Sequence, residues 1–291
     1  MTAAIAAAIA RATGKPFVPR ADRAAGGGCI NSARVLEGSD GRRFFVKTNH
    51  ARRLAMFEAE AEGLEAILAT GTVRVPRPIC SGASDEASWL VLEYLEMGGR
   101  GSAAELGRRL AALHRHGWDR YGWHRDNTIG STPQINTPCA DWVEFYRTHR
   151  LGYQYALAAR HGAPRRLIDR GERLMSGLAG FFAGHHPAPS LLHGDLWGGN
   201  HGYANGEPVI FDPAVYYGDR EADLAMTELF GGFPADFQAA YREAWPLDAG
   251  YGVRRELYNL YHVLNHFNLF GGGYLGQAER MTERLLAQLG G

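Results

Sequence analysis

A glycine-rich segment at residues 193–200 places a carboxylate and a carboxamide at a short fixed spacing. Asp195 precedes Asn200 by five residues, with Leu-Trp-Gly-Gly between them. Transfer of a phosphoryl group to a hydroxyl needs a carboxylate that accepts the hydroxyl proton and a nearby amide oxygen that holds magnesium. We therefore interpret Asp195 as a candidate general base and Asn200 as a candidate metal ligand.

The residues after this segment predict a tight hairpin. The run from Gly202 to Phe211 has Asn205-Gly206 at its centre, and Asn-Gly favours the type I′ turn between two antiparallel strands. The run ends at Asp212. We expect the return strand to carry this carboxylate back towards Asp195 and Asn200 as a second metal ligand. A capping Asp or a loop Asn is the ordinary explanation of any one of these residues, but it does not account for the ordered set.

Composition predicts a packed globular protein and restricts its partners. The chain has 291 residues, 45% of them hydrophobic, so it is long enough for two domains. Lys plus Arg and Asp plus Glu each number 31. The net charge of the chain therefore does not attract nucleic acid or an anionic membrane, and any phosphate site is expected to depend on local residues.

The cysteines and the hydrophobic runs favour a soluble, cytoplasmic protein. Cys29, Cys80 and Cys139 are too few and too scattered for a disulfide framework or a zinc ligand pair, which fits a reducing compartment. Residues 2–12 have the spacing of a short amphipathic helix and lack the features of a signal peptide. No uncharged apolar run approaches the length of a membrane span.

The first third of the sequence has the pattern of a β-rich, nucleotide-binding segment. Residues 17–48 are predicted strands, interrupted by Gly26, Gly27 and Gly28, whose backbone amides can approach a phosphate because no Cβ intervenes. An ordinary turn is the alternative for such a triplet. Lys47 ends a following strand, where it either reaches the α- and β-phosphates of a nucleotide or is a solvated lysine.

A predicted helix at residues 52–69 offers a partner for Lys47. Apolar residues recur there at intervals of three and four, which gives the helix one apolar stripe. Glu60 lies on the flank of that stripe, whereas Glu58 and Glu62 point away from it. We therefore predict that Glu60 pairs with Lys47, an ordinary surface position being the alternative.

A second apolar run, residues 88–95, predicts a buried strand that leads into a hinge, because glycines at 98, 99 and 101 follow it. The backbone of Glu93, Tyr94 and Leu95 is a candidate to hydrogen-bond an adenine edge. We place a domain boundary near residue 97. This predicts a nucleotide-binding domain at residues 1–96 and a catalytic and substrate-binding domain at residues 97–291.

The second domain is predicted to be mainly helical. Ser102 and Glu105 form a capping box at the start of its first helix, and further helices are expected at 141–160, 165–183, 221–230, 237–245 and 254–270. Residues 118–138 have little periodicity and contain Asn127, Gln134 and Asn136; such long loops tend to be functional. The polar side chains of helix 254–270 either line a substrate site or are satisfied within a partly buried helix.

The glycine loop, Lys47, Glu60, the hinge strand, the 193–200 segment and Asp212 occur in an order that resembles the protein-kinase-like fold. That fold is α+β and bilobal, with a small antiparallel-sheet N-lobe carrying one main helix and a larger, mainly helical C-lobe. His-Gly-Asp at 193–195 points to the small-molecule phosphotransferase branch. More narrowly, the chain resembles the fructosamine 3-kinase (ketosamine-3-kinase) family through the runs at 26–30, 73–78, 193–200, 211–214, 229–234 and 264–266. Two departures, Gly198 in place of serine and Pro213-Ala214 in place of Phe-Gly, leave the metal ligands intact.

The resemblance implies ATP- and Mg²⁺-dependent phosphorylation of the C3 hydroxyl of a ketosamine, free or bound to a protein. The product is labile and releases its amine, which makes the activity a deglycation repair. Bacterial-type members are expected to prefer ribulosamines or erythrulosamines to fructosamines. We take Trp197, Asn265 and His266 as candidates for the wall that contacts the sugar.

Two other functions remain open. Another small alcohol, such as an aminoglycoside, choline or homoserine, would favour an acidic acceptor site, and the region after Asp212 offers Asp219, Glu221 and Asp223. A regulatory pseudokinase is disfavoured, because such proteins usually lack a base or a metal ligand and none is missing here.

Cys29 follows the three glycines of the proposed phosphate loop and is either a redox switch or a small packed residue. Backbone amides that stabilise a phosphate also stabilise a thiolate, which would make the Cys29 thiol reactive. Oxidation could then link two chains through Cys29, so we expect either a monomer or a redox-linked dimer. We predict that diamide lowers activity reversibly, that ATP protects, and that Cys29→Ala keeps most activity and loses the sensitivity. Equally fast inactivation of Cys29→Ala would assign the effect to Cys80 or Cys139.

Overall fold

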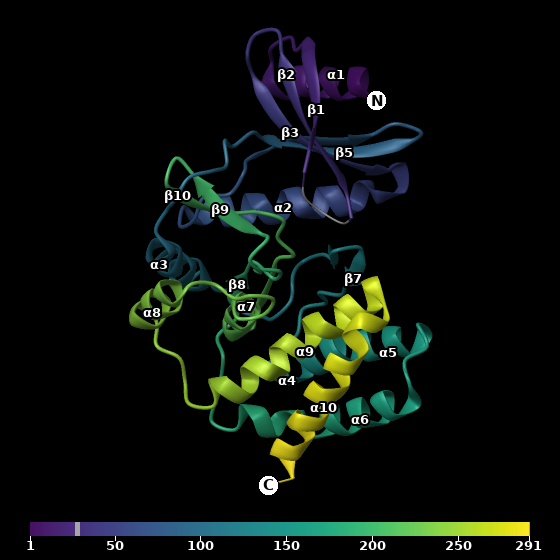
Figure 1. The fold of residues 1–291 in the computed structure, drawn as a ribbon, viewed down its shortest axis with the longest axis vertical. Helices are drawn as coiled ribbons and strands as arrows, with labels where there is room; N and C mark the ends of the chain where they lie inside the picture. Colours follow the sequence, from purple (N-terminus) through teal and green to yellow (C-terminus); the bar gives the residue numbers. More distant parts are fainter. Residues whose placement is uncertain (27–29, 291) are drawn as a thin grey trace. The chain divides into compact units, whose positions relative to one another are not determined.

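The computed structural model describes residues 1–26 and 30–290, and the chain divides into two compact units. Unit 1 consists of Met1–Ser102 and His201–Pro213, and unit 2 consists of Ala103–Asn200 and the chain from Ala214 onwards. The chain therefore passes between the units three times, after Ser102, after Asn200 and after Pro213 (Figure 1). Gly27, Gly28 and Cys29 lie outside the described residues.

Unit 1 is built on a five-stranded sheet with the strand order β1-β2-β3-β5-β4. The strands are β1 (Pro19–Ala25), β2 (Ser32–Gly38), β3 (Arg43–His50), β4 (Pro78–Ala83) and β5 (Ala87–Glu93). All neighbouring strands are antiparallel. The predicted antiparallel sheet of the N-terminal part is therefore confirmed.

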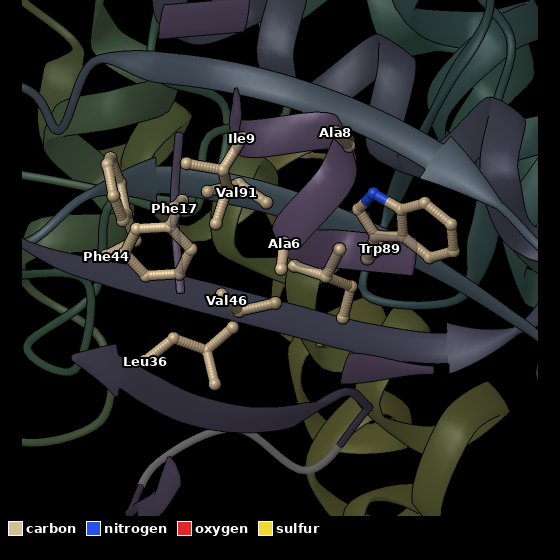
Figure 2. Close-up of a cluster of buried hydrophobic side chains, with 10 residues drawn as sticks. Ala6, Ala8, Ile9, Phe17, Leu36, Phe44, Val46, Trp89 and Val91 are labelled. Carbon is tan, nitrogen blue, oxygen red and sulfur yellow. The ribbon is translucent and has the colours of Figure 1, made fainter. Parts of the chain in front are cut away.

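Two helices cover opposite faces of this sheet. Helix α1 (Thr2–Thr13) buries Ile5 and Ile9, which lie one turn apart, in a cluster with Val46 of β3 (Figure 2). Side chains alternate along a strand, so Lys47 points to the other face. There it meets Glu60 of α2 (Leu54–Thr70). The one main helix of the predicted N-lobe is α2, and α1 closes the face behind it.

The predicted hairpin is present and belongs to unit 1. Its strands are β9 (His201–Ala204) and β10 (Glu207–Ile210). Asn205 and Gly206 have φ values of 52° and 81°, as the two central residues of a type I′ turn require.

Backbone hydrogen bonds attach this hairpin to the residues that precede β4 and follow β5. The Ile210 N–H donates to the Arg74 carbonyl over 3.0 Å, and the Gly98 N–H donates to the Tyr203 carbonyl over 2.9 Å. The units thus differ from the predicted domains, which kept residues 97–102 and 201–213 with the C-terminal part. A boundary drawn along the sequence has no means of showing that a later segment returns to the first unit.

Unit 2 is mainly helical. Its helices are α3 (Ala103–His114), α4 (Trp142–Phe145), a π-helical segment η2 (Tyr146–Gly152), α5 (Tyr153–Arg160), α6 (Arg165–Ser176), α7 (Glu221–Thr227), α8 (Ala235–Ala244), α9 (Tyr251–Phe270) and α10 (Leu275–Leu289). Two short antiparallel pairs join them, β6 (Asn127–Ile129) with β7 (Thr132–Gln134) and β8 (Ser190–Leu192) with β11 (Tyr216–Gly218). In the part of the chain that the structure describes, no helix is both long and apolar enough to cross a membrane.

Several predicted elements of unit 2 are corrected by the structure. The expected loop at 118–138 contains the β6–β7 hairpin, and the helix expected at 165–183 gives way to a 3₁₀ turn after Ser176. Helix α7 ends at Thr227 rather than at residue 230, because Phe230, Gly231 and Gly232 all adopt positive φ. Helix α10 and the β8–β11 pair were not predicted.

Candidate active site

In unit 1, one buried lysine is held by two carboxylates. The Lys47 Nζ lies 2.5 Å from Glu60 Oε1 and 2.6 Å from Asp212 Oδ1. Lys47 is 6% exposed. The predicted pairing of Lys47 with Glu60 is confirmed, and Asp212, predicted only as a metal ligand, is a second partner. This joins β3, α2 and the residue after the β9–β10 hairpin.

The charges of this cluster do not cancel. Burial by itself lowers the pKa of the Lys47 ammonium, but Asp212 and Glu60 outweigh that effect and raise the pKa above its usual value. Burial raises the pKa of Glu60, Lys47 opposes this, and Asp212 adds to it. The cluster therefore contains two acidic groups for one cationic group, an excess of one acidic group. Such an excess favours the arrival of a cation.

Asp212 occupies a conformation that few non-glycine residues adopt. Its φ is 59°, in the left-handed region, which costs on the order of 1–3 kcal/mol and persists only where neighbouring structure imposes it. The Asp212 side chain is 40% exposed, although one of its oxygens is held by Lys47. A ligand can therefore reach the carboxylate.

The other candidates for nucleotide binding in unit 1 are Gly26 and the residues at the end of β5. The Glu93 carboxylate accepts a hydrogen bond from Arg74 over 2.7 Å, and the Glu93 N–H donates to the Arg77 carbonyl over 2.8 Å. Contacts to an adenine edge remain a prediction for the backbone of Glu93, Tyr94 and Leu95. At Gly26 an added Cβ would meet no atom within 4 Å.

In unit 2, the 193–200 segment leaves β8 through a position that only glycine fits. Gly194 has a φ of 83°, and a Cβ added there would lie 2.1 Å from the Ala214 carbonyl oxygen. The Ala214 N–H donates to the His193 carbonyl over 2.8 Å. The start of the catalytic segment and the chain that re-enters unit 2 at Ala214 are therefore in direct backbone contact.

A buried carboxylate that the sequence suggested only for the alternative, cationic acceptor fixes this backbone. Asp223 of α7 accepts hydrogen bonds from the His193 N–H over 2.7 Å and the Gly194 N–H over 2.8 Å, and it lies 3.1 Å from the His114 Nε2. Burial alone would raise the pKa of Asp223, but the bonds from His114 and Gly194 outweigh it, so the pKa is lower than usual. Asp223 therefore stays ionised and positions the residue before Asp195.

The predicted proximity of Asp195 and Asn200 is confirmed. The Asn200 Nδ2 donates to the Asp195 carbonyl over 2.9 Å and lies 3.4 Å from Asp195 Oδ2. Because the amide nitrogen faces Asp195, the amide oxygen of Asn200 points away from it. Trp197 is 39% exposed, and a Cβ at Gly199 would lie 2.3 Å from its ring, so glycine lets the ring fold back over the segment.

The amide side chains of the 118–138 region hold the chain at Ala214 and Val215. The Asn127 Nδ2 donates to the Val215 carbonyl over 2.8 Å, and the Gln134 Nε2 donates to the Ala214 carbonyl over 3.0 Å. Asn136 donates to the Asn127 Oδ1 over 3.0 Å. All three amides are at most 9% exposed. The region was predicted to be functional, and it acts by supporting the backbone beside Gly194.

Asn265 and His266, predicted to contact a sugar, have different surroundings on α9. Asn265 is 2% exposed, and its Oδ1 accepts a hydrogen bond from Gln154 over 3.2 Å. His266 is half-buried, and its Nδ1 lies 2.8 Å from the His262 carbonyl. Contact with substrate remains a prediction for both, and the surroundings of His266 favour it more.

The acids proposed for a cationic acceptor are not available to one. Asp219, Glu221 and Asp223 are at most 1% exposed. Asp219 accepts a hydrogen bond from Tyr258 over 2.6 Å, and Glu221 is bonded by Arg254 through both oxygens, over 2.6 and 2.9 Å. These carboxylates bind side chains of unit 2 itself.

We predict that Asp223→Asn destabilises the protein by about 2–4 kcal/mol near neutral pH, because it removes a buried charged acceptor from three donors. The folded-state pKa of Asp223 lies below the ordinary aspartate value of 3.8, so the stabilisation is complete above 3.8 and is lost as the pH falls through the lower folded value. Urea denaturation at neutral and at acid pH should show the difference from wild type shrinking in acid.

Asp169→Asn is the control, because it breaks only an exposed pair with Arg165 on α6. An equal loss of stability in this control, or a difference for Asp223→Asn that is independent of pH, would contradict the assignment.

Comparisons with known proteins agree with this geometry. A family model described as fructosamine kinase matches residues 1–288. A protein assigned as a ketoamine kinase in Synechocystis sp. is 50% identical over 97% of this chain and 96% of its own. The chloroplastic protein-ribulosamine 3-kinase of Arabidopsis thaliana is 48% identical over 91% of this chain and 82% of its own.

Solved structures show the fold. One assigned as a fructosamine-3-kinase from Thermobifida fusca has a TM-score of 0.86 at 32% identity and covers 97% of this chain and 98% of its own. An aminoglycoside phosphotransferase has a TM-score of 0.62 at 12% identity over 97% of this chain and 98% of its own, which shows a shared protein-kinase-like fold. With a family match across nearly its whole length, the chain belongs to the fructosamine kinase family.

Proposed function

We propose that the chain transfers the γ-phosphoryl group of ATP to the C3 hydroxyl of a ketosamine, the adduct that glycation forms between a sugar and an amine. The main support for this proposal is that the fructosamine kinase family model matches residues 1–288 and that the chain contains every candidate catalytic group. Those groups are Asp195 and Asn200 in unit 2 and Lys47 and Asp212 in unit 1. Phosphorylation at C3 makes the adduct labile, so the reaction releases the amine.

The preferred sugar is a ribulosamine or an erythrulosamine ahead of a fructosamine, carried by a small amine or by a protein. This is supported by the name of the Arabidopsis relative, a protein-ribulosamine 3-kinase. We place the protein in the cytoplasm, because its three cysteines suit a reducing compartment.

Asp195 acts on the acceptor side of the reaction. Phosphoryl transfer passes through a loose transition state, so the protein contributes alignment and charge neutralisation rather than a covalent intermediate. Asp195 accepts the hydrogen bond of the C3 hydroxyl and takes its proton as the oxygen bonds to phosphorus. Asp223 fixes the backbone at Gly194, and the Asn200 amide fixes the carbonyl of Asp195, so the backbone that carries the Asp195 carboxylate is held in place.

Lys47 acts on the nucleotide side. It is kept protonated by Glu60 and Asp212, and its charge suits the phosphates of ATP. Asp212 in unit 1 and Asn200 in unit 2 each offer a hard oxygen donor of the kind that Mg²⁺ prefers. Bound Mg²⁺ would neutralise charge on the transferred phosphate. Asp212 and Asn200 are the residues that would hold it.

The proposal is tested by measuring ATP consumption with ribulose-lysine, an aminoglycoside, choline and homoserine. We expect turnover with ribulose-lysine and little with the three other alcohols, since the acids that would attract a simple cation are buried and paired. Turnover with only one of the other alcohols would show that this alcohol, and not a ketosamine, is the substrate. ATP binding without turnover of any of the four compounds would favour a pseudokinase.

Asp195→Ala is expected to lower kcat with ribulose-lysine by about 10²–10⁴, the usual effect of losing a general base. ATP affinity should change little, because the substitution removes no expected nucleotide contact. Asp236→Ala, an exposed Asp on α8, serves as the control. The assignment of Asp195 fails if the variant keeps more than a tenth of the wild-type kcat.

A further inference from the structure

Aromatic rings gather on the surface of unit 2 around His266. Its ring centroid lies 4.6 Å from that of Phe230, 5.6 Å from that of Phe270 and 5.1 Å from that of Tyr274. Phe230 and Tyr274 are 6.2 Å apart, and Phe270 and Tyr274 are 6.4 Å apart. We call these four residues the aromatic patch.

Phe230 lies in the glycine-rich turn after α7 and Tyr274 in the one after α9, whereas His266 and Phe270 belong to α9 itself. Phe230 and Phe270 are 36% and 50% exposed, which is unusual for such large apolar side chains. Phe230 also has a φ of 52°, a conformation that costs on the order of 1–3 kcal/mol and is often found at ligand clamps. The turn that contains Phe230, residues 229–234, is one of the segments in which the sequence resembles the family. None of the catalytic roles proposed above uses it.

The imidazole at the centre of the patch can only accept a hydrogen bond from a ligand. Its Nδ1 lies 2.8 Å from the His262 carbonyl, and because a carbonyl only accepts, Nδ1 carries the proton. Burial lowers the pKa of His266, although its bond to His262 opposes this, so the ring is neutral near pH 7. The lone pair therefore lies on Nε2, which makes no hydrogen bond within the described part of the chain.

Hydrogen bonds connect α9 and α7 to the backbone that precedes Asp195. On α9, the Tyr261 hydroxyl donates to the Gln134 Oε1 over 2.8 Å, and the Gln134 Nε2 donates to the Ala214 carbonyl over 3.0 Å. On α7, Asp223 accepts the Gly194 N–H over 2.8 Å. The patch, which is formed by α9 and by the turns after α7 and α9, is thus connected through both helices to the segment that carries Asp195.

We propose that the aromatic patch binds the amine half of the ketosamine, with Phe230, Phe270 and Tyr274 against the secondary ammonium and its alkyl chain and His266 Nε2 accepting an ammonium N–H. The proposal rests on the proposed function, which supplies a substrate with this group. An alkylamine is protonated at neutral pH, and ring faces attract cations. A neutral imidazole acceptor suits an ammonium N–H donor.

The rival role of these rings is to stack on the sugar, and inhibition by fragments separates the two. With ribulose-lysine as the substrate, the inhibition constants are measured for Nε-methyl-lysine amide, which has the amine and no sugar, and for ribulose, which has the sugar and no amine. We expect Phe230→Gly and Phe270→Ser to raise the constant for the amine probe by about 2- to 30-fold, the range for loss of one cation–π contact. The constant for ribulose should change less than twofold.

The imidazole is tested separately. His266→Phe keeps a ring and removes the acceptor, so it should weaken inhibition by Nε-methyl-lysine amide and leave inhibition by the Nε-trimethyl analogue, which has no N–H, unchanged. Trp118→Leu, which removes a 40% exposed ring of unit 2 outside the patch, is the control and should change neither probe.

The outcomes are distinguishable from failure of the proposed function. If wild type does not phosphorylate ribulose-lysine, the proposed function itself fails. If wild type does so but the patch variants raise the constants for ribulose and the amine probe in parallel, or leave the amine probe unaffected, the role of the patch in amine binding is overturned.

Discussion

The hydrogen bonds that Asp223 accepts from the backbone are the interaction on which the catalytic segment depends. A carboxylate that is 1% exposed has no water to stabilise its charge, so it must be compensated by donors within the protein. His193, Gly194 and His114 supply them. The backbone on either side of Gly194 therefore has little freedom, and the missing Cβ of Gly194 admits the Ala214 carbonyl.

The two units treat their buried carboxylates in opposite ways. In unit 2, the charge of Asp223 is balanced by hydrogen bonds from the protein itself, so this carboxylate has a structural role and needs no ligand. In unit 1, Glu60 and Asp212 share the single ammonium of Lys47, so negative charge is left over and one carboxylate is partly exposed. Under the proposed function, the first arrangement would give rigidity where the acceptor hydroxyl is aligned, and the second would leave room for charged ligands to bind.

The features that could be predicted from the sequence are those that depend on residues close together in the chain. The turn at Asn205-Gly206, the apolar stripe of α1 and the angular position of Glu60 on α2 depend only on near neighbours in sequence, and the structure agrees with each. Strands β8 and β11 have three residues each, too few for a period to be recognised. The role of Asp223 depends on partners 29 to 109 residues away. No pattern within α7 distinguishes such a residue from a surface carboxylate.

The return of residues 201–213 to unit 1 has a consequence for how the protein is made. Lys47 is synthesised 165 residues before Asp212, one of its two partners. When the first 102 residues have left the ribosome, unit 1 still lacks the β9–β10 hairpin, and Lys47 can pair with Glu60 but not with Asp212. Unit 1 is completed only after about half of unit 2 has been translated, so the two units cannot mature in strict order along the chain. The nucleotide-side charge cluster is therefore among the later features of the fold to form, and an incomplete chain does not present it.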